Sequence, residues 1–203
     1  MIHISLRNNK LGSVPNISLP PGLSCIPNPP CADLCYAKNF YISRKQVRKD
    51  WDENYQTYCE DPMGYFIEIS KFLSAHNPKY FRWHVGGDIP TEGYLEKMHW
   101  LADKHRGTRF LAYTKRDWIS SEPNLILIHS HWIGWDPNQR NLDRPHAMIW
   151  MKGTGLMIDT NDPKHPPFIL CPGKCAPCGH ACWYRAPGDI VIFKQHGKGI
   201  KPW

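Results

Sequence analysis

Hydrophobic and polar positions follow two different periods along the chain, and together they predict helices that alternate with strands. Apolar residues recur at helical spacing in residues 43–58, in a segment that begins at Asp61-Pro62, and from Thr91 to about His105. Asp61 and Thr91 are typical N-cap residues, and a proline directly after the cap favours a helix start. Three helices are therefore expected in the first half of the chain.

Short β-type runs lie before, between and after these segments. The predicted strands are residues 17–19, 80–85, 109–113, 125–130, 147–151 and 189–194. The alternation predicts an α/β fold with a mostly parallel sheet and right-handed crossovers. We expect one α/β domain over residues 1–165. Residues 166–203 are expected to form a cysteine-rich, metal-binding segment that packs on it.

Chemistry-bearing residues directly follow four of the predicted strands. A cysteine loop follows the first strand, Gly86-Gly87-Asp88 the second, and Thr114-Lys115-Arg116 the third, while His129 and His131 close the fourth. Ligands of parallel α/β sheets bind at the carboxyl ends of the strands. These groups are therefore expected to converge on one edge of the sheet.

Composition narrows the class of protein. Of the 203 residues, 41% are hydrophobic, and no apolar run approaches the length of a membrane span. The N-terminal residues lack the pattern of a secretory signal, so a cytoplasmic protein is expected. The formal charge of +7 favours an acidic partner, either nucleic acid or a nucleotide-like ligand. An ordinary basic surface would have the same charge.

Seven of the eight cysteines fall in two tight groups. The groups are Cys25-x5-Cys31-x3-Cys35 and Cys171-x3-Cys175-x2-Cys178-x3-Cys182. A cytosolic chain seldom keeps disulfides, so this pattern favours metal binding. The eighth cysteine, Cys59, lies in a predicted helix and is expected to be a small core residue.

The spacing also bears on which metal is bound. Four cysteines within twelve residues favour a [4Fe–4S] cluster, although zinc remains the alternative. The first group supplies only three thiolates, which leaves one coordination position open for chemistry. A fourth ligand from Cys59, a histidine or a carboxylate would close it. One or two [4Fe–4S] clusters are thus expected.

Catalytic residues are not identified by the sequence, but it offers five candidates. They are His84, Asp88, Lys115, His129 and His131. Each histidine has a structural alternative as a packed residue, Asp88 as a turn or cap residue, and Lys115 as a solvated surface charge. Lys115 with Arg116 has the chemistry to contact a phosphate or carboxylate. Trp132, Trp135 and Trp150 are expected either to stack on bases or to pack in the core.

Five stretches of the chain resemble the gene product 88 family of bacteriophages and prophages. They are Ile17-Ser18-Leu19-Pro20-Pro21-Gly22, Leu34-Cys35-Tyr36-Ala37, Tyr80 to Pro90 (YFRWHVGGDIP), Phe110 to Arg116 (FLAYTKR), and Cys171-Pro172-Gly173 with Cys182-Trp183. These stretches extend from about residue 10 to residue 195. The resemblance therefore covers nearly the whole chain.

The arrangement is also similar, more distantly, to radical S-adenosylmethionine (SAM) proteins. That resemblance implies a partial (β/α) barrel in which the loop of Cys25, Cys31 and Cys35 binds a cluster, with Tyr36 beside it. Gly86, Gly87 and Asp88 would then hold the methionine part of SAM. The loop spacing is C-x5-C-x3-C where those proteins have C-x3-C-x2-C, and Asp88 stands where they have glutamate.

Three functions are compatible with these observations. The first is an iron–sulfur protein, as a redox or radical-SAM-like enzyme acting on a nucleotide or nucleic acid. The second is a non-catalytic module that binds nucleic acid or a host protein and uses structural iron–sulfur or zinc sites. The third has zinc at one or both groups and hydrolysis at the histidine-rich strand ends. The oligomeric state is left open by the sequence.

Overall fold

A computed structural model describes residues 1–27, 31–32, 35–131, 135–136, 141–150 and 168–194. The strands are β1 (Asn16–Ile17), β2 (Tyr80–Trp83), β3 (Arg109–Thr114), β4 (Leu125–Ser130), β5 (His146–Trp150), β6 (Phe168–Leu170) and β7 (Ile190–Lys194). The helices are α1 (Tyr36–Ser43), α2 (Lys45–Glu60), α3 (Pro62–His76) and α4 (Glu92–Lys104), with a 3-10 helix, η2 (Ala181–Tyr184).

The seven strands form a single sheet in the order β1-β2-β3-β4-β5-β7-β6. Every pairing in it is parallel, which confirms the mostly parallel α/β fold expected from the sequence. Within the described residues, the outer strands β1 and β6 are connected only through the strands between them. The sheet is thus open there, and the curvature of a partial barrel stays a prediction.

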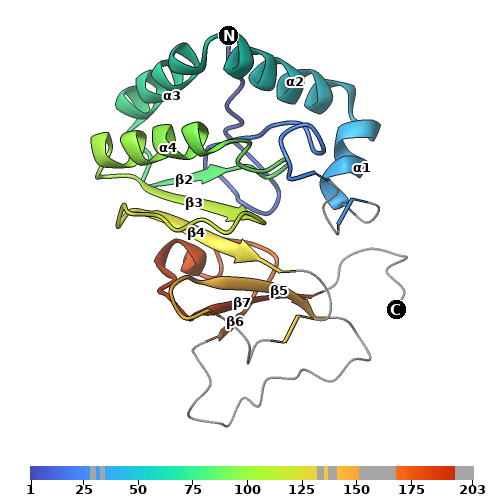
Figure 1. The fold of residues 1–203 in the computed structure, drawn as a ribbon, viewed down its shortest axis with the longest axis vertical. Helices are drawn as coiled ribbons and strands as arrows, with labels where there is room; N and C mark the ends of the chain where they lie inside the picture. The colour runs from blue at the N-terminus through green and yellow to red at the C-terminus, as the bar shows by residue number, and fades with distance from the viewer. Residues whose placement is uncertain (28–30, 33–34, 132–134, 137–140, 151–167, 195–203) are drawn as a thin grey trace.

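Helices α3 and α4 cover one face of the first strands, and Figure 1 shows α2 grouped with them at that end of the molecule. The period of two in β2 explains the packing, since Phe81 and Trp83 both point into this core. Tyr65, Phe66 and Tyr94 from the helices pack there and are fully buried. This aromatic layer anchors the helices to the sheet.

The starts of α3 and α4 were predicted correctly from their N-cap residues. Asp61 accepts a hydrogen bond from the Gly64 backbone N–H at the start of α3, and Thr91 accepts one from the Tyr94 N–H at the start of α4. The single helix predicted over residues 43–58 is instead α2, preceded by α1, with the extended residue Arg44 between them. Helix α1 buries only one residue, so it has almost no apolar periodicity to reveal it.

The carboxyl-terminal segment covers the opposite face of the sheet. Trp183 is fully buried there and donates from Nε1 to the Phe81 carbonyl at 3.2 Å. The segment also contributes β6 and β7 to the sheet. The predicted domain boundary at residue 165 lies outside the described residues. No described helix is long and apolar enough to cross a membrane.

Candidate functional site at the carboxyl edge of the sheet

Asp88 lies at the centre of the edge where β2 and β3 end. Its carboxylate accepts hydrogen bonds from the Lys115 backbone N–H at 2.9 Å and from its neighbour Ile89 at 2.7 Å. Its own N–H donates to Ser24 Oγ at 3.2 Å. Burial raises the pKa of Asp88, although the N–H groups of Lys115 and Ile89 act in the opposite direction. The residue therefore joins the turns that follow three strands.

The glycine pair before Asp88 makes room for the protein's own side chains and backbone. A Cβ on Gly86 would lie 2.2 Å from the Trp51 ring. A Cβ on Gly87, whose φ is +78°, would lie 2.4 Å from Ser24 Oγ and 2.6 Å from the Leu19 carbonyl oxygen. The absence of side chains at both positions is thus accounted for by packing within the chain.

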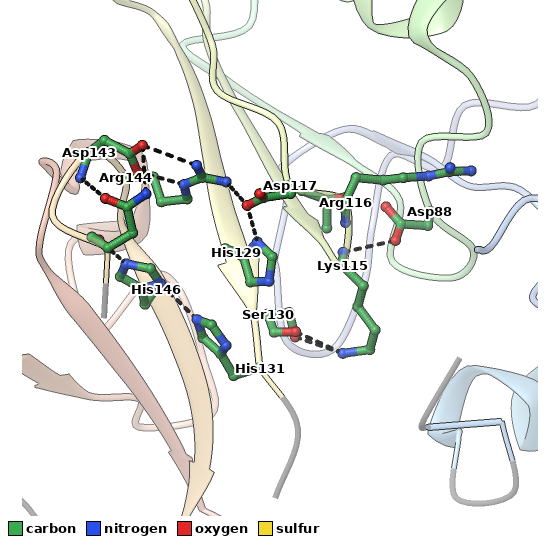
Figure 2. A network of polar contacts seen from close by, with 12 residues as sticks. Asp88, Lys115, Arg116, Asp117, His129, Ser130, His131, Asp143, Arg144 and His146 are labelled. Carbon is green, nitrogen blue, oxygen red and sulfur yellow. Dashed lines mark hydrogen bonds and ion pairs between the residues drawn. The ribbon is translucent and has the colours of Figure 1, made fainter. Parts of the chain in front are cut away.

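Lys115 and Arg116 differ in what their side chains contact. The Lys115 ammonium donates to the carbonyl oxygen and hydroxyl of Ser130, at 3.0 and 3.2 Å (Figure 2). Arg116 donates to the carbonyls of Ile89 and Pro90, and its guanidinium lies 5.0 Å from the Trp118 ring centroid. Arg116 therefore stabilises the loop after β2, whereas Lys115 reaches across to the end of β4.

The first cysteine group lies beside Asp88 and Lys115. Burial raises the pKa of the Cys25 thiol, and the negative charges of Asp88, Cys35 and Cys31 raise it further. Burial also raises the pKa of Cys31, while the Lys115 ammonium lowers it. The Gly22 N–H donates to Cys25 Sγ at 3.4 Å. The three thiols thus lie within electrostatic reach of one another and of the strand edge.

Tyr36 directly follows this group as the first residue of α1. Its hydroxyl donates to the Val85 carbonyl at 2.9 Å, in the turn that follows β2. Its side chain is 57% exposed, and the Lys10 ammonium lies 5.7 Å from the ring centroid. Tyr36 therefore ties the cysteine loop to the segment that contains Asp88.

Three histidines gather at the next part of the edge, as Figure 2 shows. The rings of His129 and His131 lie on the same face of the chain, 4.5 Å apart between centroids, as a period of two predicts. His131 Nε2 lies 2.8 Å from His146 Nδ1, and His146 Nε2 contacts the Asn141 carbonyl. Trp135 stacks on His131 at 3.6 Å, with 3° between the ring planes.

The hydrogen bonds assign proton positions in this cluster. A carbonyl oxygen only accepts, so His146 Nε2 must donate to Asn141. In the neutral form of His146, Nδ1 then accepts from His131 Nε2–H. Burial lowers the pKa of His131 to about 3 and lowers that of His129 as well. Both imidazoles are therefore neutral near pH 7, and His131, whose N–H donates to His146, has Nδ1 left as an acceptor.

His146 and the charged pair beside the cluster were not anticipated from the sequence. His146 is the first residue of β5, yet it pairs in register with His129 near the end of β4, because β5 is shifted toward the carboxyl edge. Asp117 contacts the Arg144 guanidinium and lies 3.9 Å from His129 Nδ1. Their proximity could have been predicted only from the register between β4 and β5.

His84 does not join the edge cluster. It follows β2 with φ at +53°, is 3% exposed, and has its ring 5.4 Å from that of Tyr94 between centroids. Both ring nitrogens lack a hydrogen-bond partner among the described residues. Burial lowers the pKa of His84 to about 3, and the Arg82 charge adds to this effect. The hydrogen-bonded core histidine considered from the sequence is therefore buried but unpaired.

The second cysteine group lies on the face of the sheet opposite the helices. Cys171, Cys175 and the buried Cys182 pack with Trp183 and Leu111. The Gly173 N–H donates to Cys171 Sγ at 3.4 Å, and Cys178 Sγ donates to the Cys175 carbonyl at 3.1 Å. Burial raises the pKa of Cys175 to about 11. One short turn therefore gathers these four thiols, to which we refer as the quartet.

All eight cysteines are free thiols, so neither group is cross-linked. No three histidine, cysteine, aspartate or glutamate side chains are arranged to hold a metal ion within the part of the chain that the structure describes. Cys59 is exposed on α2, so the core position expected for it is wrong. Trp132 and the side chain of Trp150 lie outside the described residues.

The comparisons with known proteins give one match. A sequence model described as gene product 88 matches residues 4–133 of the chain. That span includes the first cysteine group, Asp88, Lys115, His129 and His131, but ends before the quartet. No curated protein and no solved structure matches the chain.

Proposed function

The chain belongs to the gene product 88 family, and we propose that it is an iron–sulfur protein with an open cluster site at the carboxyl edge of its sheet. The observation that carries the proposal is the gathering of three free thiols, Cys25, Cys31 and Cys35, beside Asp88 and Lys115. Three thiolates leave a cluster iron without a protein ligand, and an open position is typical of catalytic metal sites.

Two features of the chain support a cluster over a single ion. A single zinc ion in a structural site takes four protein ligands, whereas the first group supplies three cysteines. A cubane cluster binds one thiolate at each iron that the protein ligates, so three cysteines can hold it and leave one iron open. The N–H groups of Gly22 and Gly173 donate to cysteine sulfurs, as is common around iron–sulfur clusters.

The residues beside the cysteine loop would act on whatever binds at the open position. The Lys115 ammonium would attract an anionic group. The neutral imidazole of His131, oriented by His146, would accept a hydrogen bond at Nδ1. The bound cluster would supply electron transfer or Lewis acidity. This chemistry favours a redox enzyme with an anionic substrate.

SAM is not part of this proposal. In a radical-SAM-like site the backbone at Gly86 and Gly87 would receive the methionine part of the cofactor. Here the space beside those glycines is filled by Trp51, Ser24 and the Leu19 carbonyl. The glycine pair therefore has a packing role that requires no cofactor.

A nucleic acid is the partner that the surface beside the site favours. From Tyr36 to Lys49 the chain has five cations and no acidic residue. Those cations are exposed and are Lys38, Arg44, Lys45, Arg48 and Lys49. The exposed rings of Tyr36 and Phe40 lie among them, and aromatic rings among cations are typical of surfaces that bind single strands.

Cysteine variants test the proposed cluster. We expect Cys31→Ser to lower the iron and sulfide content of anaerobically purified protein, because the open-site cluster loses one of its three thiolates. Cys59→Ser is the matched control, since Cys59 is an exposed cysteine outside both groups, and its iron content should equal that of the wild type. Equal iron in the Cys31→Ser and wild-type proteins would contradict the proposed site.

A further inference from the structure

Arg82 is a buried cation for which the described residues provide no acidic partner. It lies within β2 and is 7% exposed. Its Nη2 donates to the His84 carbonyl at 3.3 Å, and its Nε has no hydrogen-bond partner in the part of the chain that the structure describes. No described carboxylate forms an ion pair with Arg82. By contrast, Arg144 pairs with both Asp117 and Asp143.

The Arg82 side chain faces the quartet side of the sheet. Its neighbours Phe81 and Trp83 point into the core beneath the helices, so the pleat directs Arg82 to the opposite face. Its guanidinium carbon lies 4.3 Å from the ring centroid of Tyr113. Tyr113 packs in the same cluster as Cys171, Cys175 and Cys182. Arg82 and the quartet therefore share one layer.

A buried charge without a counter-ion is strongly unfavourable. Stacking on Tyr113 offsets part of that cost but does not cancel the charge. The Tyr113 hydroxyl has no nitrogen or oxygen partner among the described residues, and the Cys182 thiol lies beside it. Within the described part of the chain, the acidic groups that pack on this face are the quartet thiols and the phenols of Tyr80 and Tyr113, and a phenol is neutral near pH 7.

We propose that the quartet binds an anionic [4Fe–4S] centre and that Arg82 is its buried counter-charge. The inference rests on the proposed iron–sulfur function and extends it to the role of one residue. Four thiolates outweigh the positive charge of the cubane core, so the complete centre is an anion. Its charge would compensate that of Arg82, which no described carboxylate does.

A counter-charge of this kind acts on the reduction potential. Reduction adds one electron and makes the centre more negative, so a nearby cation stabilises the reduced form. Arg82 therefore raises the potential of the quartet cluster. It is a positioning residue in this account, because it acts on the cluster through space and contacts no substrate.

Redox titration tests the inference. The potential is measured on the cluster that remains in Cys31→Ser protein, with electron paramagnetic resonance as the signal. We expect Arg82→Gln to shift this potential to more negative values. We expect Arg82→Lys, which keeps the positive charge, to have a potential close to that of the protein with Arg82. Lys104→Gln is the matched control, because Lys104 lies on α4 on the other face of the sheet, with its ammonium 5.1 Å from the Trp100 ring centroid, and it should leave the potential unchanged.

Iron release provides a second measurement that needs no redox signal. We expect a chelator to remove iron from Arg82→Gln and Arg82→Met proteins faster than from the wild type or Lys104→Gln. The methionine variant guards against misfolding, because an apolar side chain of similar length tolerates burial. Wild-type protein without iron would overturn the proposed function. Iron in the wild type, with potential and release rate unchanged in the Arg82 variants, would overturn only the role of Arg82.

Discussion

At the scale of single residues, the chain places several titratable side chains where burial decides their charge. His84 shows this most directly, because neither ring nitrogen has a described partner and the side chain is almost fully buried. Its left-handed backbone conformation is uncommon for residues other than glycine, although histidine adopts it more often than most. The position is therefore constrained both by packing and by the turn that leads to Gly86.

His84 should make the protein less stable in acid. The pKa of His84 is lowered to about 3 in the folded state, against 6.5 for an ordinary histidine. Between these values the unfolded chain binds a proton that the folded chain does not, so stability falls as the pH drops from 6.5 towards 3. The loss is about 2 kcal/mol at pH 5, as an order of magnitude.

The variant His84→Asn checks this contribution. Asparagine tolerates the left-handed backbone but does not titrate. We expect the free energy of unfolding, measured by urea denaturation between pH 5 and pH 7, to depend less on pH in the variant than in the wild type. The same dependence in both proteins would show that His84 is not the responsible group.

What the sequence revealed at this scale was residue type and spacing. It placed Asp88, Lys115, His129 and His131 at strand ends. The structure connects Asp88 through Lys115 to Ser130, which lies between His129 and His131 in the chain. It did not identify His146, whose position depends on the register between β4 and β5. It also gave no sign that Arg82 would be buried without a carboxylate.

At the scale of elements, the α1–α2 segment combines the exposed cations and aromatic rings described above. The cysteine loop ends at Cys35, directly before α1. A single-stranded nucleic acid bound to this surface would therefore pass beside the open cluster site.

Sequence periodicity did not predict α1, because a helix that buries one residue has no apolar stripe. Strong caps at Asp61 and Thr91 made α3 and α4 predictable.

Charge removal on this segment should weaken single-strand binding. We expect the double variant Lys45→Gln/Arg48→Gln to bind a single-stranded oligonucleotide more weakly, in fluorescence anisotropy, than the wild type. If both cations contact phosphates, the slope of log affinity against log salt should decrease by about 1.4. Lys71→Gln/Lys104→Gln removes two exposed cations from α3 and α4 and is the matched control. Equal weakening in both double variants would argue against a localised surface.

At the scale of the whole molecule, the two cysteine groups occupy different parts of one sheet. The first follows β1 at the carboxyl edge, and the second packs on the face opposite the helices. The backbone N–H of Cys175 donates to the Lys10 carbonyl, and the Lys10 ammonium lies near Tyr36. The amino-terminal segment thereby connects the two groups.

The parallel α/β class was predictable because the periods of strands and helices alternate over most of the chain. The order of the last strands was not, since β7 inserts between β5 and β6. Such an insertion depends on long-range pairing, which local propensity does not encode. The match to the gene product 88 family over residues 4–133 confirms the resemblance seen in the sequence for four of the five stretches, whereas the fifth, from Cys171 to Trp183, lies outside the match, and no finding supports the likeness to radical-SAM proteins.

The most direct test of the account is elemental analysis of the wild-type protein purified without oxygen. We predict iron and acid-labile sulfide in similar amounts, with a brown colour that bleaches on addition of dithionite. Colourless protein that contains stoichiometric zinc, or no metal at all, would contradict the iron–sulfur assignment.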